Sequence, residues 1–364
     1  MKTQACIESI KKETGISYID VVCYQDHKEI FRYGSGSTGK EQLLMYSCGK
    51  LITVTAALRL IEQGFLGLDD PVCWYLPEVK NAFILDEKGE KCVVGESMLI
   101  RHLFTMTAGF TYNLNTPPIQ KLIQESKGTA KLRDFISAFI QTPLVFAPGK
   151  RFFYSLCHDV LAAVVEEVAK MPFSQFVKEQ IFTPLHMSHS YFDNNEPATA
   201  KMYTAFKDGR IEETNEGKIL LPTPAYESGG GGLSSTVEDY IRFADALACG
   251  GEAANGYRVL NDETIRLLRT TQMPYEGDEN GFTCAQGEEY GYGLGVRVRQ
   301  NDTPWGLAKG EFGWDGAAGS YVLIDPARRI SVFIGMHLRN WPFNFKGKHL
   351  RIVESIYKEF FNKI

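Results

Sequence analysis

Apolar residues recur along the chain at two spacings, one typical of helices and the other typical of strands. The clearest helical stretch covers 51–63, and Gly64 follows it as a candidate C-cap. Alternating positions predict strands over 17–24 and 29–33, which a turn near 26–28 joins as a hairpin. Further helices are predicted at 2–13, 100–107, 131–139, 160–169, 173–181, 237–247 and 348–361. Further strands are predicted at 292–299, 311–314, 320–324 and 330–337.

The order of these elements indicates the fold class. Strands lie near both ends of the chain, and helices occupy the middle. This order favours an α/β (α+β) fold in which helices flank one antiparallel sheet. The sheet would be built from both termini, with a helical segment inserted between its two parts.

Composition adds limits on partners. The 364 residues allow one large domain or two, and 44% hydrophobic with 23% charged residues is ordinary for a globular protein. A net charge of −5 without a basic run gives no support for nucleic-acid binding. No apolar stretch is long enough to span a membrane.

The N-terminus and the cysteines bear on location. The first residues lead into a polar segment without the hydrophobic region of a signal peptide. Eight cysteines are scattered without a C-x-x-C pair, as reduced cysteines are. We therefore expect a cytoplasmic protein, or an exported one if a signal has been removed.

The strongest candidate for chemistry is Ser47-Cys48-Gly49-Lys50, at the head of the predicted helix 51–63. A side chain three residues on along a helix lies on the same face, so Lys50 would sit beside Ser47. A serine hydroxyl becomes a good nucleophile once a neighbouring base takes its proton. The helix N-terminus would favour the negative charge that develops. Taken alone, the motif is better explained by a capping serine followed by a solvated lysine.

Other serine and metal arrangements find little support. There is no G-x-S-x-G elbow, and the seven histidines do not suggest a Ser-His-Asp triad. His186 and His189 have the spacing of a metal pair but no evident third ligand nearby. The G-x-G-x-x-G run at 34–39 lacks the helix and strand of a dinucleotide site. We therefore expect neither a metal nor a cofactor.

Several motifs, in order from about residue 15 onward, resemble those of the serine β-lactamase and penicillin-binding-protein superfamily. The branch they resemble is that of class C β-lactamases and family VIII carboxylesterases. The S-x-x-K motif at Ser47 is followed by counterparts of that branch's conserved elements at 60–64, 68–72, 100–109, 148–149, 154–155, 229–236 and 292–295.

This resemblance implies a β-lactamase/transpeptidase-like fold with two domains. Residues 1–75 and 205–364 would form an α/β sandwich, residues 76–204 a mostly helical domain, and the active site would lie in the cleft between them. Ser47 would be the acylated nucleophile and Tyr154 the tyrosine of the second motif.

The resemblance also assigns roles around the serine. Lys50 would lie buried against Ser47, and either Lys50 or Tyr154 would take its proton, a choice that the sequence leaves open. The backbone N–H groups of Ser47 and Ala317 would form the oxyanion hole.

The chain departs from the family pattern at two motifs. Leu156 replaces the amide of the second motif, and Trp314-Asp315-Gly316 stands where β-lactamases have K-T-G. That lysine helps to hold the substrate carboxylate, so its loss disfavours anionic substrates. Strand alternation places Trp314 and Asp315 on opposite faces, and we expect Trp314 to line the site.

We list the substrate-contacting candidates as Trp314, Asp315, Gly316, Leu156 and His158. His158-Asp159 follows Tyr154 closely and could line the same site, although capping and hydrogen bonding at the start of the next helix would explain this pair better. Loops at 110–116 and 275–286 are expected to border the site.

The sequence therefore predicts a serine hydrolase, an esterase or amidase with weak or no β-lactamase activity. Its substrate would be a small ester, an amide or a short peptide. The alternatives are a D-amino-acid peptidase, a true class C-like β-lactamase, or an acylatable ligand-binding or sensor protein with little turnover. The oligomeric state is left open.

Overall fold

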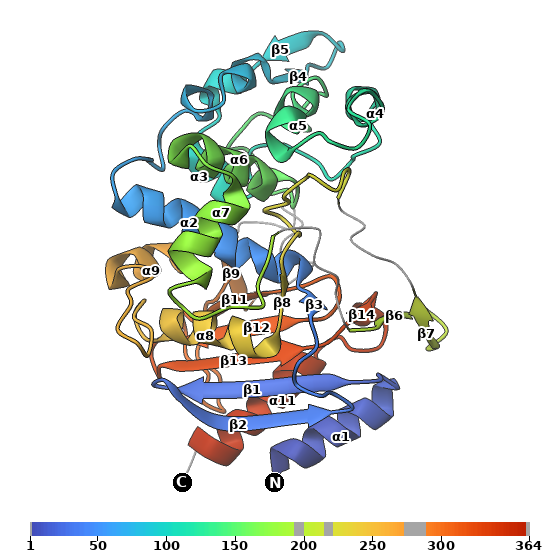
Figure 1. The fold of residues 1–364 in the computed structure, drawn as a ribbon, viewed down its shortest axis with the longest axis vertical. Helices are drawn as coiled ribbons and strands as arrows, with labels where there is room; N and C mark the ends of the chain where they lie inside the picture. The colour runs from blue at the N-terminus through green and yellow to red at the C-terminus, as the bar shows by residue number, and fades with distance from the viewer. Residues whose placement is uncertain (1, 193–199, 215–220, 273–288, 362–364) are drawn as a thin grey trace.

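A seven-stranded sheet forms the centre of the computed structural model, which describes residues 2–192, 200–214, 221–272 and 289–361 (Figure 1). Its strand order is β2-β1-β13-β12-β11-β10-β9, and every neighbouring pair is antiparallel. The strands are β1 (Ile19–Gln25), β2 (Lys28–Ser35), β9 (Tyr290–Tyr292), β10 (Arg297–Arg299), β11 (Phe312–Asp315), β12 (Tyr321–Asp325) and β13 (Ile330–Gly335).

The sheet joins the two ends of the chain, as predicted. Strand β1 pairs with β2 on one side and with β13 on the other, where Asp20 lies opposite Gly335. The hairpin turn falls at Asp26 and His27, which both have positive φ angles, as the tightest hairpin turns require. The expected antiparallel sheet built from both termini is therefore confirmed.

The single strand predicted over 292–299 is wrong, because the chain reverses inside it. Gly295 has φ +85°, and the N–H of Gly293 donates to the carbonyl of Val296 at 2.8 Å. This tight turn separates β9 from β10, which then pair with each other with Tyr292 opposite Arg297. Regular alternation concealed a turn that two glycines make possible.

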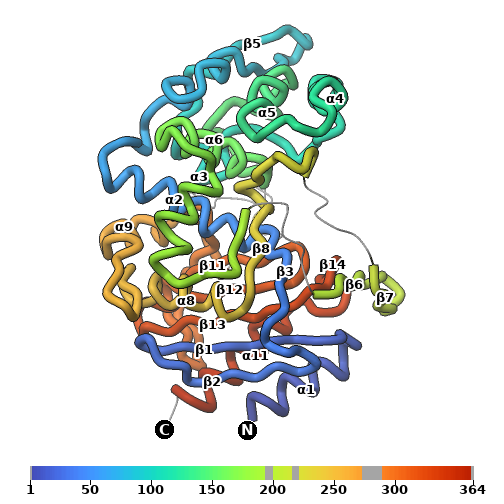
Figure 2. Tube along the Cα trace, in the orientation of Figure 1, coloured from blue at the N-terminus to red at the C-terminus, as the bar shows by residue number. Residues whose placement is uncertain are grey.

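Helices cover both faces of the sheet (Figures 1 and 2). One apolar core lies between the sheet and the terminal helices α1 (Lys2–Thr14) and α11 (Lys348–Ile356), the latter continued by a π-helical segment, Tyr357–Phe361. A larger core lies on the other face, under α2 (Gly49–Glu62), α8 (Val237–Ala248) and α9 (Asp262–Leu268).

The middle of the chain is mostly helical and lies at the end of the molecule away from both termini (Figure 2). Its helices are α3 (Ile100–Phe104), α4 (Pro117–Glu125), α5 (Leu132–Phe139), α6 (Cys157–Ala169) and α7 (Phe173–Val177), the last followed by the π-helical segment Lys178–Phe182. It also contains the hairpin of β4 (Phe83–Leu85) and β5 (Lys91–Val93). The domain boundaries at 76 and 205 stay a prediction.

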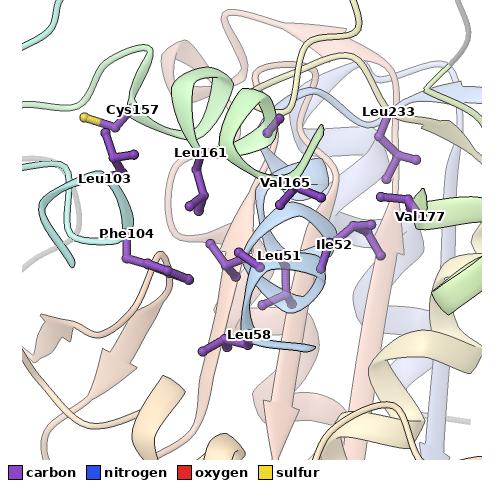
Figure 3. Close-up of a cluster of buried hydrophobic side chains, with 14 of the residues drawn as sticks. Leu51, Ile52, Leu58, Leu103, Phe104, Cys157, Leu161, Val165, Val177 and Leu233 are labelled. Atoms are coloured by element: carbon purple, nitrogen blue, oxygen red, sulfur yellow. The ribbon is translucent and has the colours of Figure 1, made fainter. Parts of the chain in front are cut away.

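Helix α2 lies between the sheet and this helical part. Its residues from Gly49 to Leu58 are all buried, a pattern typical of a helix packed on every side. Leu51 and Ile52 lie in the apolar cluster with Leu161 and Val165 of α6 (Figure 3). The start of α2 is thereby held rigidly at the junction of the two parts.

Shorter elements complete the fold. They are β3 (Leu43–Leu44) paired with β8 (Ser234–Ser235), the sheet of β6 (Met202–Ala205), β7 (Ile211–Thr214) and β14 (Leu338–Arg339), and short helical turns at Tyr46–Cys48, Val72–Trp74, Pro77–Asn81, Gly95–Ser97 and Trp341–Phe343.

Two expectations from composition can be compared with the structure. A helix long and apolar enough to cross a bilayer does not occur in the described ranges. The seven cysteines within those ranges are free thiols, as expected for reduced cysteines. Cys284 lies outside the described residues.

Candidate active site

Ser47 sits in a short helical turn, Tyr46–Cys48, that runs directly into α2. The preceding Tyr46 has φ +45°, an unusual conformation for a bulky residue and one that surrounding packing must hold. Its side chain is buried in a small cluster with Leu44, Met202 and Ala318. This packing fixes the direction in which the Ser47 side chain points, at the N-terminal end of the buried helix.

Lys50 lies beside Ser47, as the helical spacing predicts. Its Nζ is 3.2 Å from Ser47 Oγ and also donates to the carbonyl of Gly230. The side chain is completely buried, and burial lowers its pKa to about 8, although the nearby carboxyl of Asp159 raises it in part. A substantial fraction of Lys50 is therefore neutral near pH 8 and able to accept a proton.

Tyr154 joins the pair from the segment before α6. Its side chain hydrogen bonds with Ser47, and its hydroxyl accepts a hydrogen bond from Trp314 Nε1 at 3.0 Å. Lys50 Nζ lies 4.8 Å from the centre of its ring. Burial raises the pKa of Tyr154 well above its ordinary value, so the phenol keeps its proton at neutral pH.

Strand β11 contributes Trp314 and Asp315 on opposite faces, as predicted. The indole of Trp314 stacks on the Tyr154 ring with centres 5.6 Å apart, and only 4% of the residue is exposed. Asp315 lies opposite Tyr321 of β12 and lines a cavity on the other face of the sheet. Trp314 therefore packs against Tyr154, whereas Asp315 points to the opposite face of the sheet.

The turn after β11 packs against the turn that carries Ser47. A Cβ on Gly316 would lie 2.4 Å from the carbonyl oxygen of Met45, so only glycine permits this approach. The next residue, Ala317, is exposed. Within the described residues, the backbone N–H groups of Ser47 and Ala317 have no hydrogen-bond acceptor. Both are thus available to a ligand oxygen.

Sequence reasoning missed a buried polar group behind Lys50. Asp159 Oδ1 accepts hydrogen bonds from Ser228 Oγ at 2.6 Å and from Tyr226 Oη at 3.1 Å. A Cβ on Gly230 would lie 2.3 Å from Asp159 Oδ2. The glycine-rich run at 229–232 therefore allows the backbone to contact both Asp159 and Lys50.

The predicted loop at 110–116 supplies a further aromatic ring. Lys50 Nζ lies 5.6 Å from the centre of the Tyr112 ring, and the rings of Tyr112 and Tyr154 are 5.7 Å apart. The amine of Lys50 therefore lies among aromatic faces, which suits a partly charged group. The other predicted loop, 275–286, lies outside the described residues.

The prediction that His158 lines the site is wrong. The residue is completely buried, its Nε2 lies 3.2 Å from the carbonyl oxygen of Phe104, and Gly295 packs against its ring. Tyr154 precedes the first turn of α6 rather than lying in it, so helical spacing does not bring His158 to the same face. Its neighbour Asp159 points toward Lys50 instead.

The remaining candidates lie as follows. Leu156 is 5% exposed and lines a small hollow with Phe110 and Ile119, so its contact with a substrate stays a prediction. Among the described residues, the group compact enough to hold a metal ion is Asp26, His27 and Cys249, which contains none of the residues around Ser47.

Comparison with known proteins is consistent across the chain. Residues 3–355 match the model of a family described as Beta-lactamase. Protein Rv1367c of Mycobacterium tuberculosis is 31% identical over 297 residues, which cover 77% of this chain and 73% of that protein. Esterase EstB of Burkholderia gladioli is 29% identical over 317 residues, which cover 79% of this chain and 75% of that protein.

Solved structures agree. EstCE1, a hydrolase with promiscuous acyltransferase activity, superposes with a TM-score of 0.80 at 26% identity, covering 98% of this chain and 97% of its own. The unliganded simvastatin synthase LovD of Aspergillus terreus has a TM-score of 0.79 at 18% identity and covers 99% of this chain and 98% of its own. This likeness shows that the two proteins share a fold.

Proposed function

Because this chain belongs to the Beta-lactamase family and is a serine hydrolase, we propose that it cleaves small esters, and less readily amides, through an acyl-enzyme at Ser47. We propose further that it has weak or no β-lactamase activity. The observation that carries this choice is Trp314, whose buried indole donates to Tyr154. By the resemblance of its motif, Trp314 would stand where β-lactamases have an anion-binding lysine.

In the proposed acylation, Ser47 Oγ attacks the ester carbonyl while neutral Lys50 accepts its proton. Lys50 is the more available base near neutral pH, because burial lowers its pKa to about 8 and so populates the neutral amine, whereas burial raises the pKa of Tyr154 and keeps the phenol protonated. The N–H groups of Ser47 and Ala317 stabilise the oxyanion. The Tyr154 hydroxyl donates to the leaving alkoxide and is reprotonated through Lys50. Water then releases the acyl group as a carboxylic acid.

Trp314 argues against anionic substrates. A β-lactam or a D-alanyl peptide presents a carboxylate near the third motif, and an indole offers that carboxylate no positive charge. The N–H of Trp314 is already used by Tyr154. Asp315 points to the other face of the sheet and cannot compensate. A neutral acyl or alcohol group, by contrast, would pack well against the ring.

The relatives support the same choice. EstB carries the name esterase, and EstCE1 is described as a hydrolase with promiscuous acyltransferase activity. The seven free cysteines support a cytoplasmic location, which we also propose.

A substrate panel tests this function. We expect kcat/KM for p-nitrophenyl butyrate to exceed that for nitrocefin by at least about 100-fold, because the site lacks the cation that binds the lactam carboxylate. Enzyme blocked with a fluorophosphonate is the control for background hydrolysis. Nitrocefin turnover equal to ester turnover would refute the proposal. A burst of p-nitrophenol without further turnover would indicate an acylatable ligand-binding or sensor protein instead.

Restoring the missing cation gives a second test. We expect Trp314→Lys to raise kcat/KM for nitrocefin by about tenfold, because a lysine there would pair with the lactam carboxylate. Ester turnover should fall, since Tyr154 loses its hydrogen-bond donor. Trp314→Phe is the matched control, because it removes the same N–H without adding a charge. An equal gain in both variants would show that access, and not charge, limits nitrocefin hydrolysis.

A further inference from the structure

A cavity of about 550 Å³ lies on the sheet face opposite Trp314. Asp315 and Tyr321, which face each other across β11 and β12, form one wall. Trp341, Lys346 and His349, at and before the start of α11, form the other. Trp314 belongs to the apolar core under α2, whereas Tyr321 belongs to the core under the terminal helices, so the wall formed by Asp315 and Tyr321 faces away from Ser47.

Two buried polar atoms in the cavity wall have no hydrogen-bond partner among the described residues. Arg297 is 1% exposed, and its Nη2 donates to the carbonyl of Val322 at 2.9 Å and to Glu311 at 3.3 Å. Its Nη1 has no hydrogen-bond partner within the described part of the chain, and neither does the buried hydroxyl of Tyr321. A buried charged donor left without an acceptor is costly, so these atoms favour a ligand that accepts hydrogen bonds.

The position of the guanidinium is fixed. Arg297 Cζ lies 4.2 Å from the centre of the Tyr321 ring and 5.6 Å from that of Tyr290, so the group is held between aromatic faces. Its bond to Val322 and its ion pair with Glu311 hold it from the far side. Nη1 is thus a preorganised donor, and a carboxylate could bind it and the Tyr321 hydroxyl together.

We propose that this cavity binds a small aromatic carboxylate. Arg297 and Lys346 bring positive charge to the cavity, whereas Asp315 in its wall and Glu311, paired with Arg297, offset that charge, which disfavours a phosphate dianion. The rings of Tyr290, Trp341 and Tyr321 offer stacking surfaces. The volume is that of an ordinary small-molecule site.

The cavity is also connected to the turn that carries Ala317. Trp341 Nε1 donates to the carbonyl of Gly316 at 3.1 Å, and His349 Nε2 lies 2.8 Å from the carbonyl oxygen of Gly319. These two cavity residues therefore contact both ends of that turn. The binding proposal itself does not depend on any reaction at Ser47.

Calorimetric titration with 2-naphthoate tests the proposal, with neutral 2-naphthamide as the charge control. We expect the carboxylate to bind at least about tenfold more tightly than the amide, because only the carboxylate pairs with Arg297. Tyr321→Phe removes a hydroxyl that has no hydrogen-bond partner in the described ranges, so the fold should persist while affinity for the carboxylate falls about fivefold. A thermal melt of the variant checks the fold.

Protein labelled at the nucleophile with a fluorophosphonate separates this site from the serine. We expect labelled and unlabelled protein to bind 2-naphthoate equally. Loss of binding on labelling would place the ligand in the acyl site and overturn the proposal. Equal affinity for acid and amide, no measurable binding of the acid, or no effect of Tyr321→Phe would overturn it as well.

Discussion

We expect Ser47→Ala to lower kcat/KM for p-nitrophenyl butyrate by about 10⁴-fold or more and to abolish labelling by a fluorophosphonate. No other hydroxyl in the described site has the same position, because only Ser47 lies both within 3.2 Å of Lys50 Nζ and in hydrogen-bond contact with Tyr154. Ester turnover of the purified variant, with intact-protein mass spectrometry after labelling, measures both effects.

The matched control is Cys48→Ala. Cys48 adjoins the nucleophile and is itself a nucleophilic residue type, but its Sγ is buried and contacts the carbonyl of Ser320 at 3.4 Å. Burial also raises the pKa of its thiol, so the thiolate is disfavoured. We expect this variant to keep its activity within about tenfold. Full labelling of Ser47→Ala, or loss of labelling in Cys48→Ala, would contradict the assignment.

The dependence of the reaction on pH is the second large effect. If Lys50 is the base, its neutral form is the active one, and burial places its pKa at about 8. Below that pH, kcat/KM should rise about tenfold per pH unit, because each unit increases the neutral fraction about tenfold. Above it, the rate should level off. Lys50→Met keeps the length of the side chain without the amine, and we expect it to lose about 10³-fold at pH 8.

A pH profile of the opposite slope would identify a different base. A rate that falls above pH 8 would require Lys50 to be protonated, with Tyr154 as the base in its phenolate form. Tyr154→Phe then separates the two cases. It should cost about 10²-fold or less if the hydroxyl only donates a proton, and as much as Lys50→Met if it is the base. Nucleophile labelling at each pH provides the control for stability.

Residue spacing and alternation were sufficient to predict side-chain positions where a single segment determines the geometry. The spacing of Ser47 and Lys50 placed both side chains on one face, and their Nζ–Oγ distance of 3.2 Å agrees. The side chain of Thr236, directly before the helix predicted at 237–247, accepts the N–H of Asp239, as threonine commonly does at a helix N-cap. The faces of Trp314 and Asp315 followed from alternation along a single strand.

Residue spacing could not predict contacts between segments that are distant in the sequence. The partners of Asp159 are Tyr226 and Ser228, 67 and 69 residues further along the chain, and no spacing connects them. Closeness to Tyr154 in sequence favours His158 instead. The environment of Lys50 likewise depends on the carbonyl of Gly230, which a sequence pattern shows only as a turn. Such contacts depend on the folded sheet and its inserted helices.

The pairing of β1 with β13 has a consequence for synthesis on the ribosome. Strand β1 is made early, yet one of its two neighbours is complete only when residue 335 has been added. Ser47 and Lys50 emerge long before the turn at Gly316 that packs against Met45. A nascent chain therefore carries its nucleophile without Trp314 or the N–H of Ala317 for most of its translation. The hydrolase should become reactive late, in a single step that coincides with closure of the sheet.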